Sequence, residues 1–330
     1  MNMKRSFRLV LFLIVAAGMV AVAYQIADAQ KKTAFPTRPI ELIVPYSPGG
    51  GSGVTAETMK KIVSDDKLSP QPLVITYKPG ASGQVGWAYL ATRKGNGHTI
   101  ATATTGFTFG FVLKQSQLKP EDFTPIANML MDTQLLVTYT NSPFKSVKDV
   151  IAASKKAPNS VKISGTSAIG PDSTVANMLE AAEGIKLNMI PFMSGGEASA
   201  AILGGHVDLA ISNPNELFPQ IEAGKLRPLA VFSDKRLSAL KEVPTMIDLG
   251  YNMQFFTHRG VLAPAGIPKH EEEYLVGLMK KITQSKGWAE YANKNMMTIQ
   301  FTGGSDYAKY LAEERAKITN ILKSMGKIKD

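Results

Sequence analysis

The chain has 330 residues, of which 44% are hydrophobic and 19% are charged, a composition typical of a globular protein with room for two ordinary domains. It contains no cysteine, which excludes disulfides, thiol catalysis and a lipid anchor on an N-terminal cysteine. Its formal net charge of +10 at pH 7 favours anionic ligands, but the lysines are scattered along the sequence rather than clustered.

The first 29 residues have the three-part pattern of a secretory signal peptide. A basic stretch at residues 1–8 precedes an apolar core at residues 9–23, and an Ala-x-Ala cleavage site follows at residues 27–29. The apolar core is shorter than the ~20 residues that span a bilayer, so a membrane anchor is the weaker interpretation. We expect cleavage after Ala29 and export of a soluble chain, for which nucleic acid is not an expected partner.

The next part of the chain alternates strand patterns with helix patterns. Apolar runs predict strands at residues 39–46, 72–78 and 97–105. Apolar residues at helical spacing follow the first strand at residues 56–63, and a turn of small residues leads into a helix within residues 80–94. This β–α–β–α–β order predicts a largely parallel sheet with helices on its faces.

A second alternating set begins near residue 133. The predicted strands are residues 133–140, 161–166, 187–192, 208–213 and 226–233, and the predicted helices are residues 146–156, 172–184, 196–207 and 214–225. The tail adds a strand and turn at 259–266, a helix from His270 to about Ser285, a strand at 297–303 and a helix from Ser305. Because no low-complexity linker separates the sets, we expect two α/β domains between which the chain crosses.

Four strand-to-helix junctions consist of small polar residues, at 49–53, 80–83, 165–173 and 194–196. The backbone N–H groups at a helix N-terminus carry partial positive charge and can bind an anion. In open α/β sheets, ligands lie beyond the carboxyl ends of the strands, where these junctions lie. One such junction is most simply a tight turn, but four of them in two domains favour a shared anion cleft.

Motifs for nucleotides, metals and hydrolases are missing from the sequence. Val54 stands where G-x-G-x-x-G needs its third glycine, and no G-x-x-x-x-G-K-[ST] is present. The segment HEEEY at His270 lacks the second histidine of a zinc motif, and GTSAI at 165–169 lacks the last glycine of G-x-S-x-G. Three acids could form an acid–base set, although each also fits as a cap or a surface charge: Asp172, Glu197 and Asp208. The sequence therefore favours a binding protein over an enzyme, with no cofactor and no metal.

Five long segments run through the chain in a characteristic order: PIELIVPYSPGGGSGVTAETM, YKPGASGQVGWAYLATRKGNGHTI, ILGGHVDLAISNPNE, AGKLRPLAVFSDKR and RGVLAPAGIP. Together they resemble the solute receptors of tripartite tricarboxylate transporters, the Bug-type periplasmic binding proteins. The resemblance implies an α/β class II periplasmic-binding-protein fold, with two lobes, interlobe crossings and a ligand cleft between the lobes. We predict lobe 1 at residues 30–134 and 259–330, and lobe 2 at residues 135–258.

The resemblance also implies which residues bind the ligand. They are Tyr46, Ser47, Gly50, Ser52, Ala81, Ser82, Ser164, Gly165, Thr166, Ser167, Ser194, Asn213 and Arg259. The loop of Gly50 is expected to hold a carboxylate. Arg259 could bind a second carboxylate through two hydrogen bonds from its planar guanidinium, or it could form a structural ion pair at the hinge. The sequence does not distinguish these two roles. Three phenylalanines could wall the cleft or belong to the core: Phe192, Phe255 and Phe256.

Three departures from the family pattern bear on the ligand. Family members usually carry an acid where Gly53 stands, and its loss argues against an amino-acid ligand. Gly170 and Pro171 lengthen the junction after SGT, and His258 replaces a usual tryptophan.

The function that the resemblance implies is that of a monomeric periplasmic receptor. It would close around a small organic acid, such as a dicarboxylate, a tricarboxylate or an aromatic acid, and deliver it to the membrane subunits of a tripartite transporter. Two alternatives stay open: an exported hydrolase with Ser82 or Ser167 as its nucleophile, and a receptor that serves a sensor kinase.

Overall fold

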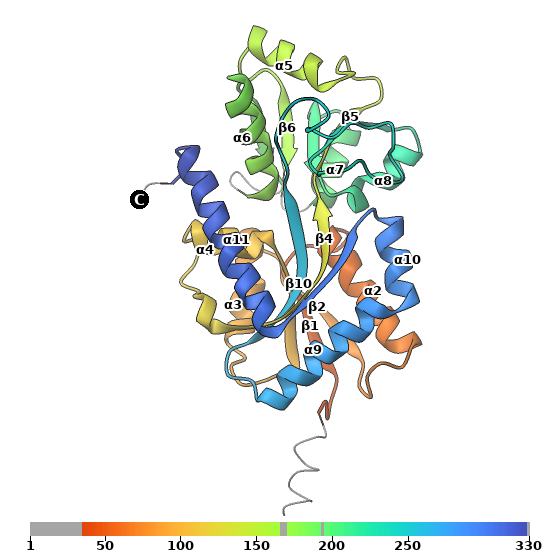
Figure 1. Ribbon diagram of the computed structural model, residues 1–330, viewed down its shortest axis with the longest axis vertical. Helices are drawn as coiled ribbons and strands as arrows, with labels where there is room; N and C mark the ends of the chain where they lie inside the picture. Colours follow the sequence, from red (N-terminus) through yellow and green to blue (C-terminus); the bar gives the residue numbers. More distant parts are fainter. Residues whose placement is uncertain (1–34, 166–169, 193–194, 329–330) are drawn as a thin grey trace, which may run out of the picture.

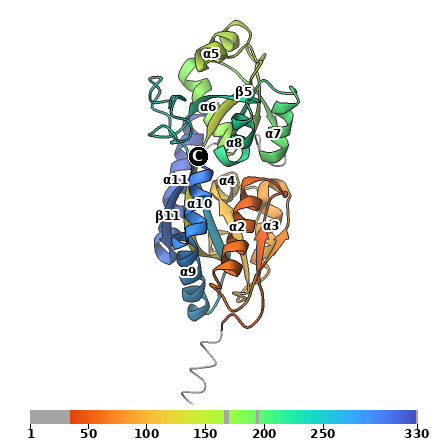
Figure 2. The same ribbon diagram turned by 90° about the vertical axis from the view of Figure 1, so that its right-hand side faces the viewer.

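The computed structural model describes residues 35–165, 170–192 and 195–328, and it contains two β-sheets with helices on their faces (Figure 1). The sheets lie one above the other along the long axis of the molecule, as the view turned by 90° also shows (Figure 2). The predicted α/β class with two lobes is thereby confirmed. The predicted signal peptide, residues 1–29, lies outside the described residues. Among the described helices, none is long and apolar enough to cross a membrane.

The first sheet has six strands in the order β11-β4-β10-β3-β1-β2. They are β1 (Ile40–Val44), β2 (Leu73–Tyr77), β3 (Thr99–Thr104), β4 (Phe123–Thr133), β10 (Phe256–Pro264) and β11 (Thr298–Gly303). β1 pairs parallel with β2 and β3, whereas β10 pairs antiparallel with β3 and β4, and β11 pairs antiparallel with β4. The predicted parallel pairing is therefore confirmed for the β–α–β–α–β series, β1 to β3, whereas β10 and β11 come from the end of the chain and add antiparallel pairs to the sheet.

Both faces of the first sheet are buried, which explains the continuous apolar run of β1. Ile40, Leu42 and Val44 belong to one core, whereas Ile43 points to the opposite face and belongs to another. The helices of the first core are α2 (Gly51–Asp65), α9 (Lys269–Gln284) and α10 (Lys286–Lys294), and those of the second are α3 (Gln84–Ala91), α4 (Thr105–Val112) and α11 (Gly304–Ser324).

The second sheet has five strands in the order β7-β6-β8-β5-β9. They are β5 (Leu135–Tyr139), β6 (Lys162–Gly165), β7 (Asn188–Pro191), β8 (Leu209–Ser212) and β9 (Leu226–Val231). β6 pairs parallel with β7 and β8, and β5 pairs antiparallel with β8 and β9. Its helices are α5 (Val147–Lys156) and α6 (Pro171–Glu183) over one face, and α7 (Gly195–Leu203) and α8 (Pro214–Glu222) over the other.

The chain passes between the sheets at two adjacent places. β4 ends at Thr133 and β5 begins at Leu135, so Gln134 forms the first crossing, and the second leads into β10 at Phe256. The Gln134 amide Nε2 donates a hydrogen bond of 3.1 Å to the Thr257 hydroxyl, which ties the two crossings together.

Helix α11 packs against both sheets. It begins against the first sheet, and its later residues Ile318 and Leu322 pack into a core of the second sheet (Figure 1). The predicted lobe boundaries, with lobe 1 at 30–134 and 259–330 and lobe 2 at 135–258, stay a prediction.

Three elements were absent from the sequence prediction: β4, α4 and α10. α4 has the sequence TGFTFGFV, whose buried residues surround the helix, so it has no polar face to mark a helical period. α10 follows α9 directly, and the Ser285 hydroxyl caps it by accepting the Trp288 N–H at 3.1 Å.

Candidate functional site

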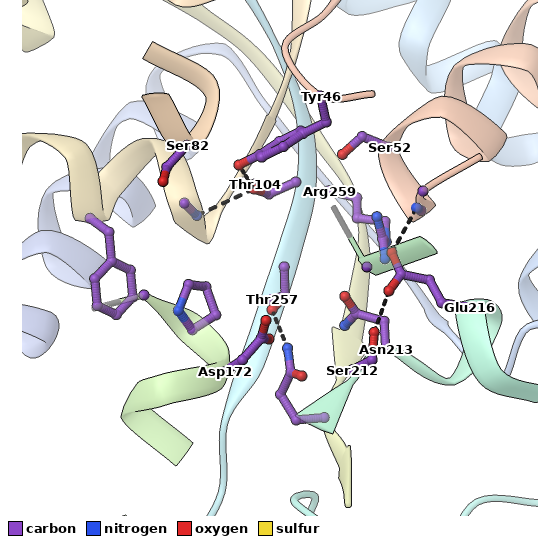
Figure 3. A pocket seen from close by; sticks show the side chains of 18 of the residues that line it. Tyr46, Ser52, Ser82, Thr104, Asp172, Ser212, Asn213, Glu216, Thr257 and Arg259 are labelled. Atoms are coloured by element: carbon purple, nitrogen blue, oxygen red, sulfur yellow. Dashed lines mark hydrogen bonds between the residues drawn. The ribbon is translucent and has the colours of Figure 1, made fainter. Parts of the chain in front are cut away.

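A cleft between the two sheets is lined by residues of both (Figure 3). The first sheet and its helices contribute Tyr46, Gly50, Gly51, Ser52, Ser82, Thr104, Gly106, Phe109, Thr257 and Arg259. The second sheet and its helices contribute Gly170, Pro171, Asp172, Gly195, Ser212, Asn213 and Glu216. Six of the predicted binding residues therefore lie together at this cleft, namely Tyr46, Gly50, Ser52, Ser82, Asn213 and Arg259.

The first loop connects β1 to α2 and brings a helix N-terminus to the cleft. Gly50 is the N-cap of α2, and neither a capping side chain nor an acid in the first turn satisfies the free N–H groups. Instead, the Gly51 N–H donates to Glu216 Oε1 at 2.7 Å, from α8 on the other side of the cleft. A carboxylate of the protein itself thus occupies part of the place predicted for a ligand carboxylate.

Tyr46 projects from the same loop toward Thr104, and the two hydroxyls lie 3.3 Å apart (Figure 3). Burial raises the pKa of Tyr46 to about 12, so its phenol stays neutral at pH 7 and keeps a proton to donate. Ser47 is half-exposed and is not among the lining residues.

The second junction is a turn with unusual backbone angles. Gly80, Ala81, Ser82 and Gly83 all have positive φ, of 135°, 46°, 53° and 96°. This turn directs Ser82 to the cleft and leaves Ala81 exposed outside it. At Gly83 a Cβ atom would lie 2.7 Å from the Trp87 ring, so only glycine fits there.

The third junction follows β6 and only partly matches the prediction. Ser164 is fully buried and its hydroxyl donates to the Leu209 carbonyl at 3.5 Å, so it does not line the cleft. Gly165 lies against Asp172, whose Cβ would be 2.9 Å from a Cβ at position 165. Thr166, Ser167 and Ser194 lie outside the described residues.

The departure at Gly170 and Pro171 falls in the cleft itself, at the start of α6. The other two departures do not. Gly53 lies in the first turn of α2, where a Cβ atom would meet the Tyr77 ring at 3.3 Å.

His258 is fully buried outside the cleft, between β10, α4 and α11. Its Nδ1 atom lies 3.0 Å from Glu314 Oε1, and the Thr105 hydroxyl donates to the same oxygen at 2.9 Å. Burial alone would raise the pKa of Glu314, but His258 and the hydroxyls of Thr108 and Thr105 lower it below its ordinary value. The substitution at 258 therefore concerns the packing of α11 rather than the cleft.

Arg259 lies on β10 at the floor of the cleft and forms an ion pair with Asp132 of β4. Its Nε and Nη2 atoms donate to Asp132 Oδ2 at 3.0 and 2.5 Å. Arg259 is 5% exposed and Asp132 is 0% exposed. Burial raises the pKa of Asp132 to about 6, against the opposing effect of Arg259. Of the two interpretations of Arg259, the structural ion pair is present, and the grip on a ligand stays a prediction.

The three phenylalanines that could wall the cleft lie elsewhere. Phe192 and Phe255 pack with the two cores of the second sheet, and Phe256 lines a separate groove together with Met131 and Met297.

The hydrolase alternative concerns Ser82, since Ser167 is not described. Among the described residues that line the cleft there is no histidine, so a Ser82 nucleophile would need a carboxylate as its base.

Sequence reasoning missed two acids of the site, Glu216 and Asp132. Glu216 occupies the third position of α8, where an acid is expected to stabilise its own helix, so nothing in the sequence marks its bond across the cleft. The sequence did indicate a role for Asp132, because it is the one charged residue within the run MLMDTQLL. A buried acid needs a partner.

Residues 54–327 match the family model described as tripartite tricarboxylate transporter family receptor. Protein BugT of Bordetella pertussis is 31% identical over 257 residues, which are 76% of this chain and 76% of BugT. The solved structure of the periplasmic binding protein BugD superposes with a TM-score of 0.84 at 23% identity, covering 90% of this chain and 100% of BugD. Rpa4515 of R. palustris, solved with adipate, gives a TM-score of 0.82 at 23% identity and covers 88% and 98% of the two chains.

Proposed function

The chain belongs to the tripartite tricarboxylate transporter receptor family, and from this premise we propose that it is a periplasmic receptor that captures a small organic carboxylate and delivers it to the membrane subunits of a tripartite transporter. The two lobes would close around the acid, which shifts the population from open to closed forms. The adipate bound to Rpa4515 supports a small organic carboxylate as the ligand.

One observation carries the proposal: the N-terminus of α2 presents backbone N–H groups to the cleft without a cap from its own sequence, and the Gly51 N–H already binds a carboxylate. Ser52, Ser82 and the neutral Tyr46 phenol add hydroxyl donors at the same cleft. Such a set of donors suits a carboxylate better than a cation or an apolar ligand.

A thermal-shift screen of organic acids, followed by calorimetry, tests the proposal. An acid at 100 times its Kd should add ~2.7 kcal/mol to the free energy of unfolding. The bound acid should be recovered unchanged, since turnover would favour the hydrolase alternative. Uptake of the labelled acid by membranes that contain the transporter subunits distinguishes delivery from service to a sensor kinase.

Gly50→Val tests the loop, because the added side chain would stand between the helix N-terminus and the ligand. Gly50 has φ of −82° and ψ of 170°, which any residue adopts, so the fold should survive. We expect binding to be lost with a circular dichroism spectrum like that of the wild type. Gly277→Val is the matched control, because a Cβ at Gly277 meets nothing within 4 Å. Equal affinity of both variants would show that the loop is only a turn.

Export is part of the proposal. We expect the protein recovered from the periplasm to begin at Gln30, and mass spectrometry of the intact chain measures this directly. A membrane-bound product that retains Met1 would contradict export of a free receptor.

A further inference from the structure

The lining of the cleft contains more acidic side chains than basic ones. Arg259 is its one cation among the described residues, and Asp132 lies against it with two hydrogen bonds. Asp172 and Glu216, which both come from the second sheet's helices, are two further acids in the lining of the cleft. The undescribed segments 166–169 and 193–194 contain no ionisable side chain in the sequence, so they add no charge.

Glu216 is held in place by neutral groups. Its Oε1 atom accepts the Gly51 N–H at 2.7 Å, and its Oε2 atom accepts the Ser212 hydroxyl. Gly195 makes room for it, because a Cβ atom there would lie 1.8 Å from Oε2. Since both donors are neutral, these bonds fix the carboxylate without cancelling its charge, and Arg259 is the cation at the cleft that interacts with it electrostatically.

Asp172 reinforces the same side of the cleft. It is 5% exposed and lies in the first turn of α6, as Glu216 lies in the first turn of α8. The positive end of each helix dipole attracts a negatively charged side chain in the first turn. The wall contributed by the second sheet is therefore anionic, whereas the N-terminus of α2 opposite offers N–H donors.

We infer that the cleft selects organic acids that carry a protonated amine as well as a carboxylate, with Glu216 as the residue that determines this specificity. The inference rests on the proposed function. The ligand carboxylate lies at the N–H and hydroxyl donors of the first two junctions, and the amine lies between Glu216 and Asp172. A second carboxylate at that position would face two like charges.

Gly53 bears on the same choice of ligand. The absence of an acid there argued against an amino-acid ligand, but Glu216 brings a carboxylate to the N-terminus of the same helix from the opposite lobe. The acid that recognises the amine is thus supplied by lobe 2.

Matched probes test the inference by calorimetry at constant ionic strength. In each set, an ammonium, a carboxylate or a methyl group ends a chain of equal length: glycine, malonate and propionate; β-alanine, succinate and butyrate; γ-aminobutyrate, glutarate and pentanoate; δ-aminovalerate, adipate and hexanoate. In the set that fits the cleft, we expect the amino acid to bind at least about tenfold more tightly than the dicarboxylate.

Glu216→Gln keeps the shape and the acceptor for Gly51 but removes the charge. It should reduce the preference for the amine about tenfold, mostly by weakening the amino acid. Glu222→Gln is the control, because it makes the same charge change at the exposed far end of α8. Asp172→Asn should act in the same direction, and it gives the answer if thermal unfolding shows that Glu216→Gln does not fold.

The outcomes separate the two levels of the proposal. A dicarboxylate that binds as tightly as its amino-acid match overturns the inference and leaves the receptor function standing. An unchanged preference in Glu216→Gln and Asp172→Asn overturns the role of these acids. If neither these probes nor the wider organic-acid screen binds at all, the proposed function fails as well.

Discussion

Arg259 and Asp132 form a buried ion pair directly beneath the cleft, and each depends on the other. A guanidinium donates two hydrogen bonds from one planar group, which a lysine ammonium cannot reproduce. Arg259→Lys should therefore lower the free energy of unfolding of the unliganded protein, on the order of 2 kcal/mol.

Denaturant unfolding with and without the best acid of the screen measures this effect and the affinity together. Arg236→Lys is the control, because its partner Asp248 and the arginine itself are both exposed. Unchanged stability with a lower affinity would show that Arg259 serves the ligand and not the fold.

The raised pKa of Asp132 gives the stability a specific dependence on pH. Because the folded value of about 6 exceeds the ordinary value of 3.8, the folded state binds a proton more readily than the unfolded state. The stabilisation from this proton is complete below 3.8 and is lost as the pH rises through about 6, a change on the order of 3 kcal/mol.

Asp132→Asn cannot titrate at this position, so it provides the reference. We expect the stability of the wild type minus that of Asp132→Asn to decrease as the pH rises from 4 to 7, measured by thermal unfolding at several pH values. A difference that instead increases with pH would place the pKa of Asp132 below its ordinary value.

At the scale of elements, the turn at residues 80–83 is the clearest example of backbone shaped for a site. Ala81 and Ser82 adopt positive φ, which costs a residue with a Cβ atom roughly 1–2 kcal/mol. Because Ala81 is exposed and does not line the cleft, its strain can be relieved without touching the ligand.

Ala81→Gly should raise the melting temperature or leave it unchanged, although glycine usually destabilises a protein. Ala88→Gly, at an exposed position inside α3, should lower the stability by about 1 kcal/mol. Equal losses in both variants, measured by calorimetric melting, would contradict the strain at Ala81.

The elements also show what the sequence could predict. β1 and β2 were predicted to within two residues, because an apolar run bounded by proline and by small polar residues has few other interpretations. β4 was missed because its pattern is interrupted by Pro125 and Asn128, and its partners β10 and β11 come from the end of the chain. Local patterns cannot predict pairing at such a distance in sequence.

The candidate site was likewise predictable only where local sequence patterns mark it. The junction loops can be recognised in the sequence by their small residues, and Gly50, Ser52 and Ser82 do line the cleft. Glu216 could not be predicted, because its partner Gly51 lies 165 residues away on the other lobe.

At the scale of the molecule, the hydrogen bond from the Gly51 N–H to Glu216 is a direct contact between the lobes. It adds to the ties at the crossings, where Asn213 Nδ2 also donates to the Thr133 carbonyl at 3.0 Å. α11 packs against both lobes, and this packing should limit how far the lobes can separate. We therefore expect an opening motion of modest amplitude, in which the Gly51–Glu216 bond stabilises the closed form.

Removing this bond should shift the unliganded population toward open forms. The chain has no cysteine, so cysteines introduced at the exposed residues Lys60 of α2 and Lys225 after α8 can be labelled selectively. In Glu216→Ala, the distance distribution between the two labels should become longer and broader than in the wild type. A net bond of about 1 kcal/mol changes the ratio of closed to open forms roughly fivefold, which such a distribution resolves. Glu222→Ala on the same helix should leave the distribution unchanged, and a Glu216→Ala distribution that coincides with it would show that crossings and α11 alone hold the lobes.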